Sequence, residues 1–157
     1  PVCVRSRTGY VFTLANHPVL WKSSLQLEIA LSTLESEYIA LSTAMRELIP
    51  ARRLLEEIIR HVDPEAMKEV LMIKSVVWED NNGCISTVQA PKLTPRTKHI
   101  AVKYHFSRSY LQRSDEKESK SKFVIKKIDS ELQLTDIFTK CLSEETFVRL
   151  RKLLCGW

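Results

Sequence analysis

Three acidic residues, Glu37, Asp80 and Asp136, are candidates for shared chemistry. Each lies beside an element with a strong apolar pattern, so folding could bring the three side chains together. Several converging carboxylates can hold two divalent cations about 4 Å apart, because such cations prefer oxygen ligands and need their charge offset. A pair of this kind activates water and stabilises the leaving oxygen in phosphodiester hydrolysis. Whether this chemistry is available depends on the elements that carry the three acids.

The first acid lies near the start of a predicted helix. Ser32 and Glu35 fit the S/T-x-x-E capping box, in which the two side chains satisfy free N–H groups of the helix start. Glu37 stands close to the apolar stripe of this helix, where a carboxylate is costly unless it is paired. The stripe comprises Tyr38, Leu41, Met45 and Leu48. Either Glu37 lies at the edge of the stripe and reaches solvent, or something in the fold pairs with it.

The other two acids also have structural alternatives. Asp80 ends the run 70–80, whose tail reads as a buried parallel strand, and ligands of open α/β sheets bind outside the carboxyl ends of such strands. It could equally cap the short helix predicted over 84–89. Asp136 lies in the first turns of an amphipathic helix predicted over 131–140, where a solvated acid is the simpler interpretation. The residues alone leave these alternatives open.

The remaining pattern predicts an α/β domain. β-Branched and aromatic residues predict strands over 9–14, 19–24 and 122–128, with a short extended piece over 27–30. Apolar periodicity predicts further helices over 34–60, 97–111 and 144–154. Pro50 lacks a backbone donor, so we expect a kink or a break near Ile49. This order predicts a mixed sheet, with an antiparallel hairpin followed by parallel strands and flanking helices, in a single domain over 1–157.

Composition narrows the class of protein. The chain has 157 residues, a net charge of +5 and 44% hydrophobic residues, which suits one globular domain and is compatible with a polyanionic partner. No apolar run approaches the ~20 residues of a membrane-spanning helix. The four cysteines are scattered without metal-ligand spacing, which favours a reduced, intracellular protein. The chain starts without Met or a signal peptide, as expected of a fragment of a longer chain.

Five blocks of the sequence point to a family. They are Ser6–Phe12, Leu31–Leu41, Glu79–Asn82, Arg96–Ile100 with Tyr104–Phe106, and Leu134–Lys140. In this order and spacing they resemble the ribonuclease H domain of copia-type LTR retrotransposon Pol polyproteins. The resemblance implies a ribonuclease H-like fold, with a mixed five-stranded sheet and helices around it. It also implies divalent-metal-dependent endonucleolytic cleavage of the RNA strand of RNA–DNA hybrids during reverse transcription.

The resemblance further implies the site. Glu37, Asp80 and Asp136 fall on catalytic, metal-binding acids of the family, and a complete site is expected to hold two Mg²⁺ or Mn²⁺ ions. The family's first catalytic Asp lies ahead of the block that begins here at Ser6, and residues 1–8 contain no acid. We therefore expect the first strand to be missing or incomplete in an N-terminally truncated polyprotein fragment, with low or absent activity. The alternative is an inactive relic of the same fold, acting as a structural or weak nucleic-acid-binding segment.

The expected partner is the RNA–DNA hybrid, which is recognised by shape, sugar and phosphate. Candidates for phosphate contacts are Arg96, Lys98, Lys103 and Arg108, although a solvated basic helix face explains them equally well. A structural role is the simpler interpretation of His99 and His105. The family implies a reverse transcriptase domain on the N-terminal side and a cytoplasmic retrotransposon particle with a nuclear phase, with no membrane partner. A basic binding module of another kind would require the three acids to lie far apart.

Overall fold

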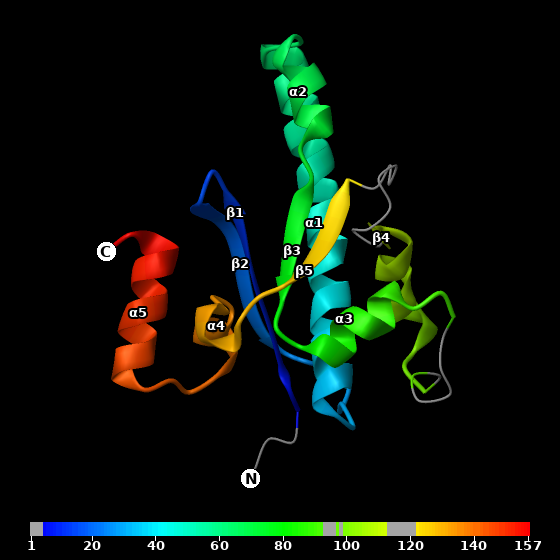
Figure 1. The fold of residues 1–157 in the computed structure, drawn as a ribbon, viewed down its shortest axis with the longest axis vertical. Coiled ribbons are helices and arrows are strands. Elements are labelled where there is room, and N and C mark those ends of the chain that lie inside the picture. Colours follow the sequence, from blue (N-terminus) through cyan, green and yellow to red (C-terminus); the bar gives the residue numbers. More distant parts are fainter. Residues whose placement is uncertain (1–4, 93–96, 98, 113–121) are drawn as a thin grey trace.

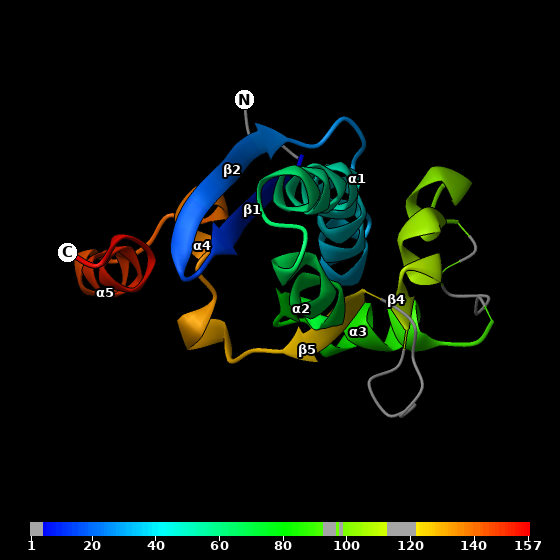
Figure 2. The same cartoon turned by 90° about the horizontal axis from the view of Figure 1, so that it is seen from above.

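A computed structural model describes residues 5–92, 97, 99–112 and 122–157. Its elements, in chain order, are β1 (Arg7–Leu14), β2 (His17–Leu25), α1 (Thr33–Val62), α2 (Ala66–Met72), β3 (Ser75–Glu79), α3 (Asn82–Gln89), the 3₁₀ helix η2 (Val102–Ser109), β4 (Leu111–Gln112), β5 (Phe123–Lys127), the 3₁₀ helix η3 (Ser130–Leu132), α4 (Asp136–Thr139) and α5 (Glu144–Cys155). Helix α1 runs through the middle of the molecule (Figure 1). Seen from above, β1, β2, α4 and α5 lie on one side of α1, and β4 lies on the other (Figure 2).

The strands form two sheets. Strands β1 and β2 make an antiparallel hairpin with a register irregularity between Phe12 and Thr13. Its turn uses Ala15 and Asn16, which have positive φ angles of 49° and 65°. Strands β3, β5 and β4 form a parallel sheet in the order β3-β5-β4. The predicted strand directions are confirmed, but the hairpin and the parallel strands are not joined in one mixed sheet, because no ladder links them within the described residues.

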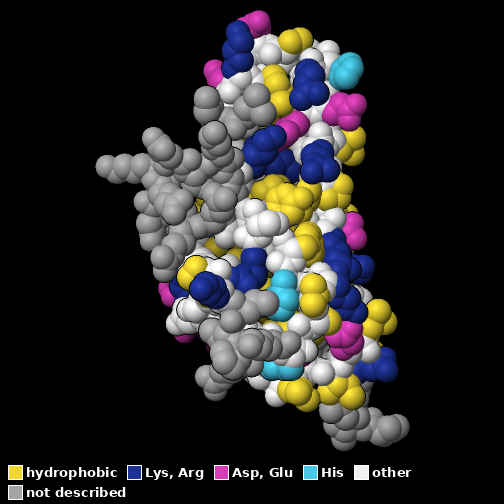
Figure 3. Space-filling model, turned by 90° about the vertical axis from the view of Figure 1, so that its right-hand side faces the viewer, with side chains coloured by type: hydrophobic (Ala, Val, Ile, Leu, Met, Phe, Trp, Pro, Cys, Tyr) yellow, Lys and Arg dark blue, Asp and Glu magenta, His cyan; other side chains and the backbone are white. Residues whose placement is uncertain are grey.

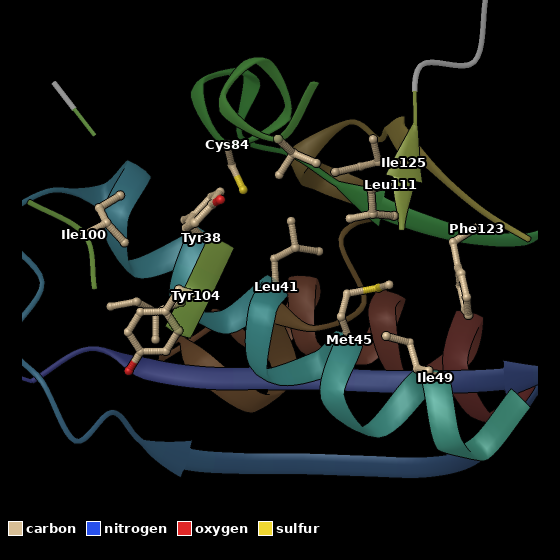
Figure 4. Packing of buried hydrophobic residues seen from close by; sticks show 12 residues of the cluster. Tyr38, Leu41, Met45, Ile49, Cys84, Ile100, Tyr104, Leu111, Phe123 and Ile125 are labelled. Carbon is tan, nitrogen blue, oxygen red and sulfur yellow. The ribbon is translucent and has the colours of Figure 1, made fainter. Parts of the chain in front are cut away.

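The core is built on one face of α1. Tyr38, Leu41, Met45 and Ile49 are buried along this face and point toward α3, β4 and β5 (Figure 4). The spacing of these residues is that of a helix stripe. The predicted stripe is therefore confirmed at Tyr38, Leu41 and Met45, whereas the predicted Leu48 is only partly buried and Ile49 is the buried residue of that turn. Glu37 immediately precedes this stripe, and the packing that buries Tyr38 therefore also fixes the direction of Glu37.

The start of α1 is capped as the sequence predicts. The backbone N–H of Glu35 donates to the Ser32 hydroxyl at 3.1 Å, and the Glu35 carboxylate accepts from the N–H of Leu31 at 2.8 Å. Of the kink or break predicted near Ile49, the break does not occur, because α1 is one continuous helix of 30 residues with Pro50 inside it. An internal proline costs a helix about 3 kcal/mol, and packing of α1 against β1, η2, α2 and α3 offsets it.

A buried ionic network holds the far half of α1. The guanidinium of Arg52 donates to the carbonyl of Ile73 at 2.7 Å, to the Ser75 hydroxyl at 2.8 Å and to the Glu56 carboxylate at 2.8 Å. Lys122 donates to the second oxygen of Glu56 at 2.7 Å. Burial raises the pKa of Glu56, but the bonds and charges of Lys122 and Arg52 outweigh burial and lower it overall. The network ties α1 to the end of α2 and the start of the parallel sheet.

Several predicted boundaries are corrected. Residues 27–30 form no strand, and residues 66–72, for which no helix was predicted, form α2. The helix predicted over 97–111 is the 3₁₀ helix η2 followed by β4, and 131–140 contains only short helical turns. The helix predicted over 144–154 and the strand predicted over 122–128 are confirmed as α5 and β5. Within the described residues, no helix is both long and apolar enough to span a membrane.

Candidate functional site

Glu37 lies in the second turn of α1 and is partly buried. Burial raises the pKa of its carboxyl, and the negative charge of Asp80 raises it further. Lys140 lowers this pKa, and Asp136 raises it. These effects require all three charged groups to lie near Glu37, because Coulomb interactions weaken with distance and are screened by water. The structure therefore brings the three acids predicted from the sequence into one neighbourhood.

Asp80 is held between β3 and α3. The predicted alternative, in which Asp80 caps the short helix, is wrong, because the side chain of Asn81 accepts from the N–H of Cys84 at 3.0 Å. Helix α3 begins against the start of α1, where a Cβ on Gly83 would lie 2.9 Å from Leu34 Cδ1. Glycine thus permits the close approach that carries Asp80 toward the first turns of α1.

Asp136 is the first residue of α4, and its side chain is only 14% exposed. Both of its carboxylate oxygens lie 2.9 Å from Nζ of Lys140, one turn later on the same segment. Helix α4 packs directly on β1, where a Cβ on Gly9 would lie 2.5 Å from Thr139 Cγ2. The hydroxyl of Ser23 on β2 also donates to the carbonyl of Phe138 at 2.6 Å. The hairpin therefore fixes the position of α4, and with it Asp136.

A fourth carboxylate, Glu79, belongs to the same cluster. It is the last residue of β3, it is 6% exposed, and one oxygen accepts from the N–H of Asn81 at 2.9 Å. Burial raises the pKa of Glu79 to about 7; the Asn81 hydrogen bond opposes this, while the nearby charges of Glu37 and Asp80 add to it. Sequence reasoning treated Glu79 as part of a strand. An acid ending an apolar run directly before Asp80 was the signal that could have found it.

Cys84 closes the inner side of the cluster. The thiol is fully buried, and burial together with the charges of Glu79 and Glu37 raises its pKa. Figure 4 shows its sulfur beside Tyr38 within the core. A protonated thiol at this place packs as a small side chain and is hydrogen-bonded to the carboxylate of Glu79.

The donor chemistry of the cluster suits a hard divalent cation, since Glu37, Asp80 and Asp136 offer only oxygen atoms. Among the residues that the structure describes, however, no three His, Cys, Asp or Glu side chains are arranged to hold a metal ion. A cation already paired with one of these acids is the ammonium of Lys140, whose pKa is lowered by burial but raised overall by its bond to Asp136 and the charges of Asp136, Asp80 and Glu37. Lys140 is thus paired with Asp136 and interacts electrostatically with Glu37 and Asp80.

The basic candidates have mixed surroundings. Arg96 and Lys98 lie outside the described residues. Lys103 is hydrogen-bonded to Glu28, and Arg108 is partly buried and donates to the carbonyl of Ala90. Lys and Arg side chains, with His among them, spread over the face of the molecule in Figure 3. Phosphate contacts by these residues stay a prediction.

His99 and His105 make different contacts. His105 Nε2 lies 3.2 Å from the carbonyl of Ile100 and therefore donates to it, which leaves Nδ1 to accept from the Tyr38 hydroxyl at 2.9 Å. Burial lowers the pKa of His105, and the charge of Arg108 adds to this effect. His99 Nε2 lies 3.4 Å from the capping carboxylate of Glu35. These contacts suit the structural role predicted for both side chains.

The chain is similar over most of its length to Pol polyproteins of retrotransposons. It is 33% identical over 150 residues, 96% of its length, to the Retrovirus-related Pol polyprotein from transposon TNT 1-94 of Nicotiana tabacum. It is 30% identical over 143 and 142 residues to the corresponding polyproteins from transposons RE1 and RE2 of Arabidopsis thaliana. The chain spans only 10%, 9% and 9% of these three proteins. No family model and no solved structure matches it.

Proposed function

We propose that this chain is the ribonuclease H domain of a retrotransposon Pol polyprotein and that it cleaves the RNA strand of RNA–DNA hybrids. The observation that carries the proposal is the electrostatic coupling of Glu37, Asp80 and Asp136, which come from α1, the end of β3 and α4. The similarity to retrotransposon Pol polyproteins over most of the chain supports the same context.

In this proposal, Glu37, Asp80 and Asp136 hold Mg²⁺ or Mn²⁺. Bound divalent cations would supply the charge that activates water and stabilises the leaving oxygen in phosphodiester hydrolysis. The protein's own contribution is positional. The Ser32–Glu35 cap fixes the turn before Glu37, the Asn81 cap fixes the turn after Asp80, and α4 is seated on the hairpin.

Positively charged side chains on the surface support the proposal of an RNA–DNA hybrid as the substrate. A hybrid presents phosphates and 2′-hydroxyls rather than a readable base code, so positively charged side chains suffice for much of the binding. Lys103 and Arg108 lie on η2, and Figure 3 shows Lys and Arg side chains among acidic and hydrophobic ones on one face of the molecule. Binding by this face should weaken as salt concentration rises, because phosphate contacts release counterions.

The test is cleavage of a labelled RNA–DNA hybrid in Mg²⁺ or Mn²⁺. It uses residues 1–157 and, in parallel, a longer segment of the polyprotein that includes residues upstream of Pro1. Glu37→Gln should reduce cleavage by about 100-fold or more, because it removes a charged ligand but keeps the side-chain shape. It should leave stability nearly intact, since burial and two neighbouring carboxylates already disfavour the ionised form of Glu37.

Glu57→Gln is the matched control, because Glu57 lies on the exposed side of the same helix. Full cleavage by the Glu37→Gln variant would refute the assignment of Glu37. Metal binding without cleavage in both lengths of chain would instead favour the inactive relic, a segment that keeps the fold and the acids but has lost the reaction.

A further inference from the structure

We propose that the outer face of the parallel sheet binds single-stranded nucleic acid, with a base stacked on Trp78 and phosphates held by neighbouring lysines. The outer face is the face of β3 and β5 that points away from α1, and Figure 1 shows these two strands in front of that helix. The inference goes beyond the proposed function, because it needs neither a metal ion nor cleavage and concerns side chains outside the acidic cluster.

Trp78 is a large apolar side chain that the fold leaves in water. Along β3 the side chains alternate, so that Val77 packs against the core, whereas Val76 and Trp78 on either side of it are 38% and 52% exposed. A tryptophan with half of its surface in water forgoes much of the stabilisation that burial would supply. A flat aromatic side chain exposed on a strand is the arrangement on which proteins stack the bases of unpaired nucleic acid.

The cations near Trp78 indicate the chemistry of the ligand. Lys126 is the cross-strand partner of Trp78 in the ladder of β3 and β5, and its Nζ lies 6.0 Å from the centre of the indole ring. Lys126 and the following Lys127 are exposed, and so is Lys74, which precedes β3. Lysine is depleted from protein–protein interfaces, because its ammonium group would lose its water there. A single strand of nucleic acid offers both a base for the ring and phosphates for the lysines.

The stacking contact requires an unpaired base. In a duplex each base is stacked between its neighbours, and a ring lying on a sheet surface reaches only phosphates and sugars. Trp78 directly precedes Glu79 and Asp80, so a strand bound along β3 passes beside the acidic cluster. The occupant is therefore a single-stranded stretch of RNA or DNA, such as the unpaired extension of a longer hybrid.

The experiment measures binding of fluorescein-labelled oligothymidylate and oligouridylate, each of about twelve nucleotides, to residues 1–157 in the presence of a chelator and at low salt. Trp78→Ala should raise Kd about tenfold for both, because one stack between a base and an aromatic ring is lost. Trp78→Phe keeps a ring and should stay within about threefold of the unmodified chain. Lys126→Gln should reduce the slope of log Kd against log salt concentration by about 0.7, as for one lost phosphate contact, whereas Trp78→Ala should leave this slope unchanged.

Trp157→Ala is the matched control, because Trp157 is 73% exposed and Arg151 lies 5.3 Å from the centre of its ring, but beyond the end of α5 and not on the sheet. It should leave Kd unchanged, and circular dichroism should show every variant folded. Unchanged binding by Trp78→Ala, an equal loss in Trp157→Ala, or no binding by the unmodified chain would overturn the inference.

Another result would assign Trp78 to a protein contact. If Trp78→Ala lowered the sedimentation coefficient and left oligonucleotide binding unchanged, the ring would mediate association between copies of the chain, and the inference would be wrong. Because the chelator removes divalent cations, failure of this experiment is separate from failure of the proposed cleavage, which is measured in Mg²⁺ or Mn²⁺.

Discussion

Replacing Gly9 by alanine tests whether the contact between β1 and α4 positions Asp136. The added Cβ would lie 2.5 Å from Thr139 Cγ2, 3.0 Å from Phe138 Cβ and 3.3 Å from the carbonyl oxygen of Thr135. A contact below about 3.0 Å cannot be kept, so either the Thr139 side chain must rotate and lose its present hydrogen bond or α4 must move. The φ angle of Gly9 is not positive, and the penalty is therefore one of packing rather than of backbone conformation.

The size of the effect follows from these contacts. Extra atoms in a packed site typically destabilise a protein by about 1–3 kcal/mol, and we expect about 2 kcal/mol here because two of the three neighbours belong to the backbone or lie next to it. For a chain of this length, that corresponds to a fall of about 4–8 °C in Tm. Urea unfolding gives the free energy directly. The same variant should bind Mn²⁺ less tightly, because α4 carries Asp136.

A second substitution makes this prediction specific. Thr139→Ser removes Cγ2 but keeps the hydroxyl that donates to the carbonyl of Thr135 at 3.3 Å. In the double variant, part of the destabilisation should therefore be recovered, with a coupling energy of about 1 kcal/mol. Strict additivity of the two single effects would refute the proposed contact and with it the role of Gly9 in placing α4.

Two further predictions concern pH. Glu79→Gln should be more stable than the unmodified chain above pH 7, by at most about 3 kcal/mol, and about equally stable near pH 4.5, because a pKa raised from 4.5 to about 7 makes folding less favourable as pH rises across that interval. Urea unfolding in the presence of a chelator at several pH values measures this difference. A difference in unfolding free energy that does not change with pH would contradict the prediction. Glu56 has the opposite sign, since its lowered pKa contributes stability above pH 4.5 that is lost on acidification. Glu56→Gln should therefore cost about 1–3 kcal/mol at pH 7 and progressively less at lower pH, and a constant difference would show that the bonds to Arg52 and Lys122 do not depend on the charge of Glu56.

The local signals in the sequence were strong where one physical effect acted alone. Ser32 and Glu35 make the predicted capping contacts, and the stripe from Tyr38 to Met45 is buried as its spacing indicates. Strand β5 was equally clear, because Val124 and Ile125 are apolar on both faces of a covered strand. In each case the local preference and the tertiary packing agree.

Errors arose where apolar residues are not buried. Leu27 and Ile29 suggested a strand, yet they are 84% and 55% exposed in a loop. The helix α2 was hidden for another reason, since Val70–Met72 is a short apolar run that suits a strand or a helix equally. Pro50 suggested a kink or a break near Ile49, and the packing of α1 on both sides of Pro50 prevents the break. Each error is a local preference overridden by tertiary contacts.

The spacing of acidic residues in the sequence does not show which of them lie together in the fold. Glu37, Asp80 and Asp136 lie far apart in sequence, and each had a plausible structural role by itself. The capping role of Asp80 was excluded only when Asn81 was seen to accept from Cys84. Glu79 and Lys140 were missed because their importance comes from neighbours on other segments, which the sequence does not reveal without the fold.

The separation of the two sheets has a consequence for the behaviour of the chain in solution. In a two-stranded ladder each strand is an edge, and β2 exposes Val19 and Trp21, at 56% and 60%, along such an edge. An exposed apolar edge is a template for strand pairing between molecules. Pro18 and Lys22 interrupt this strand with a missing donor and a charge, which are the features that limit such pairing. Strand β2 is therefore where self-association of the isolated chain is expected to begin, and the same strand holds α4 through Ser23.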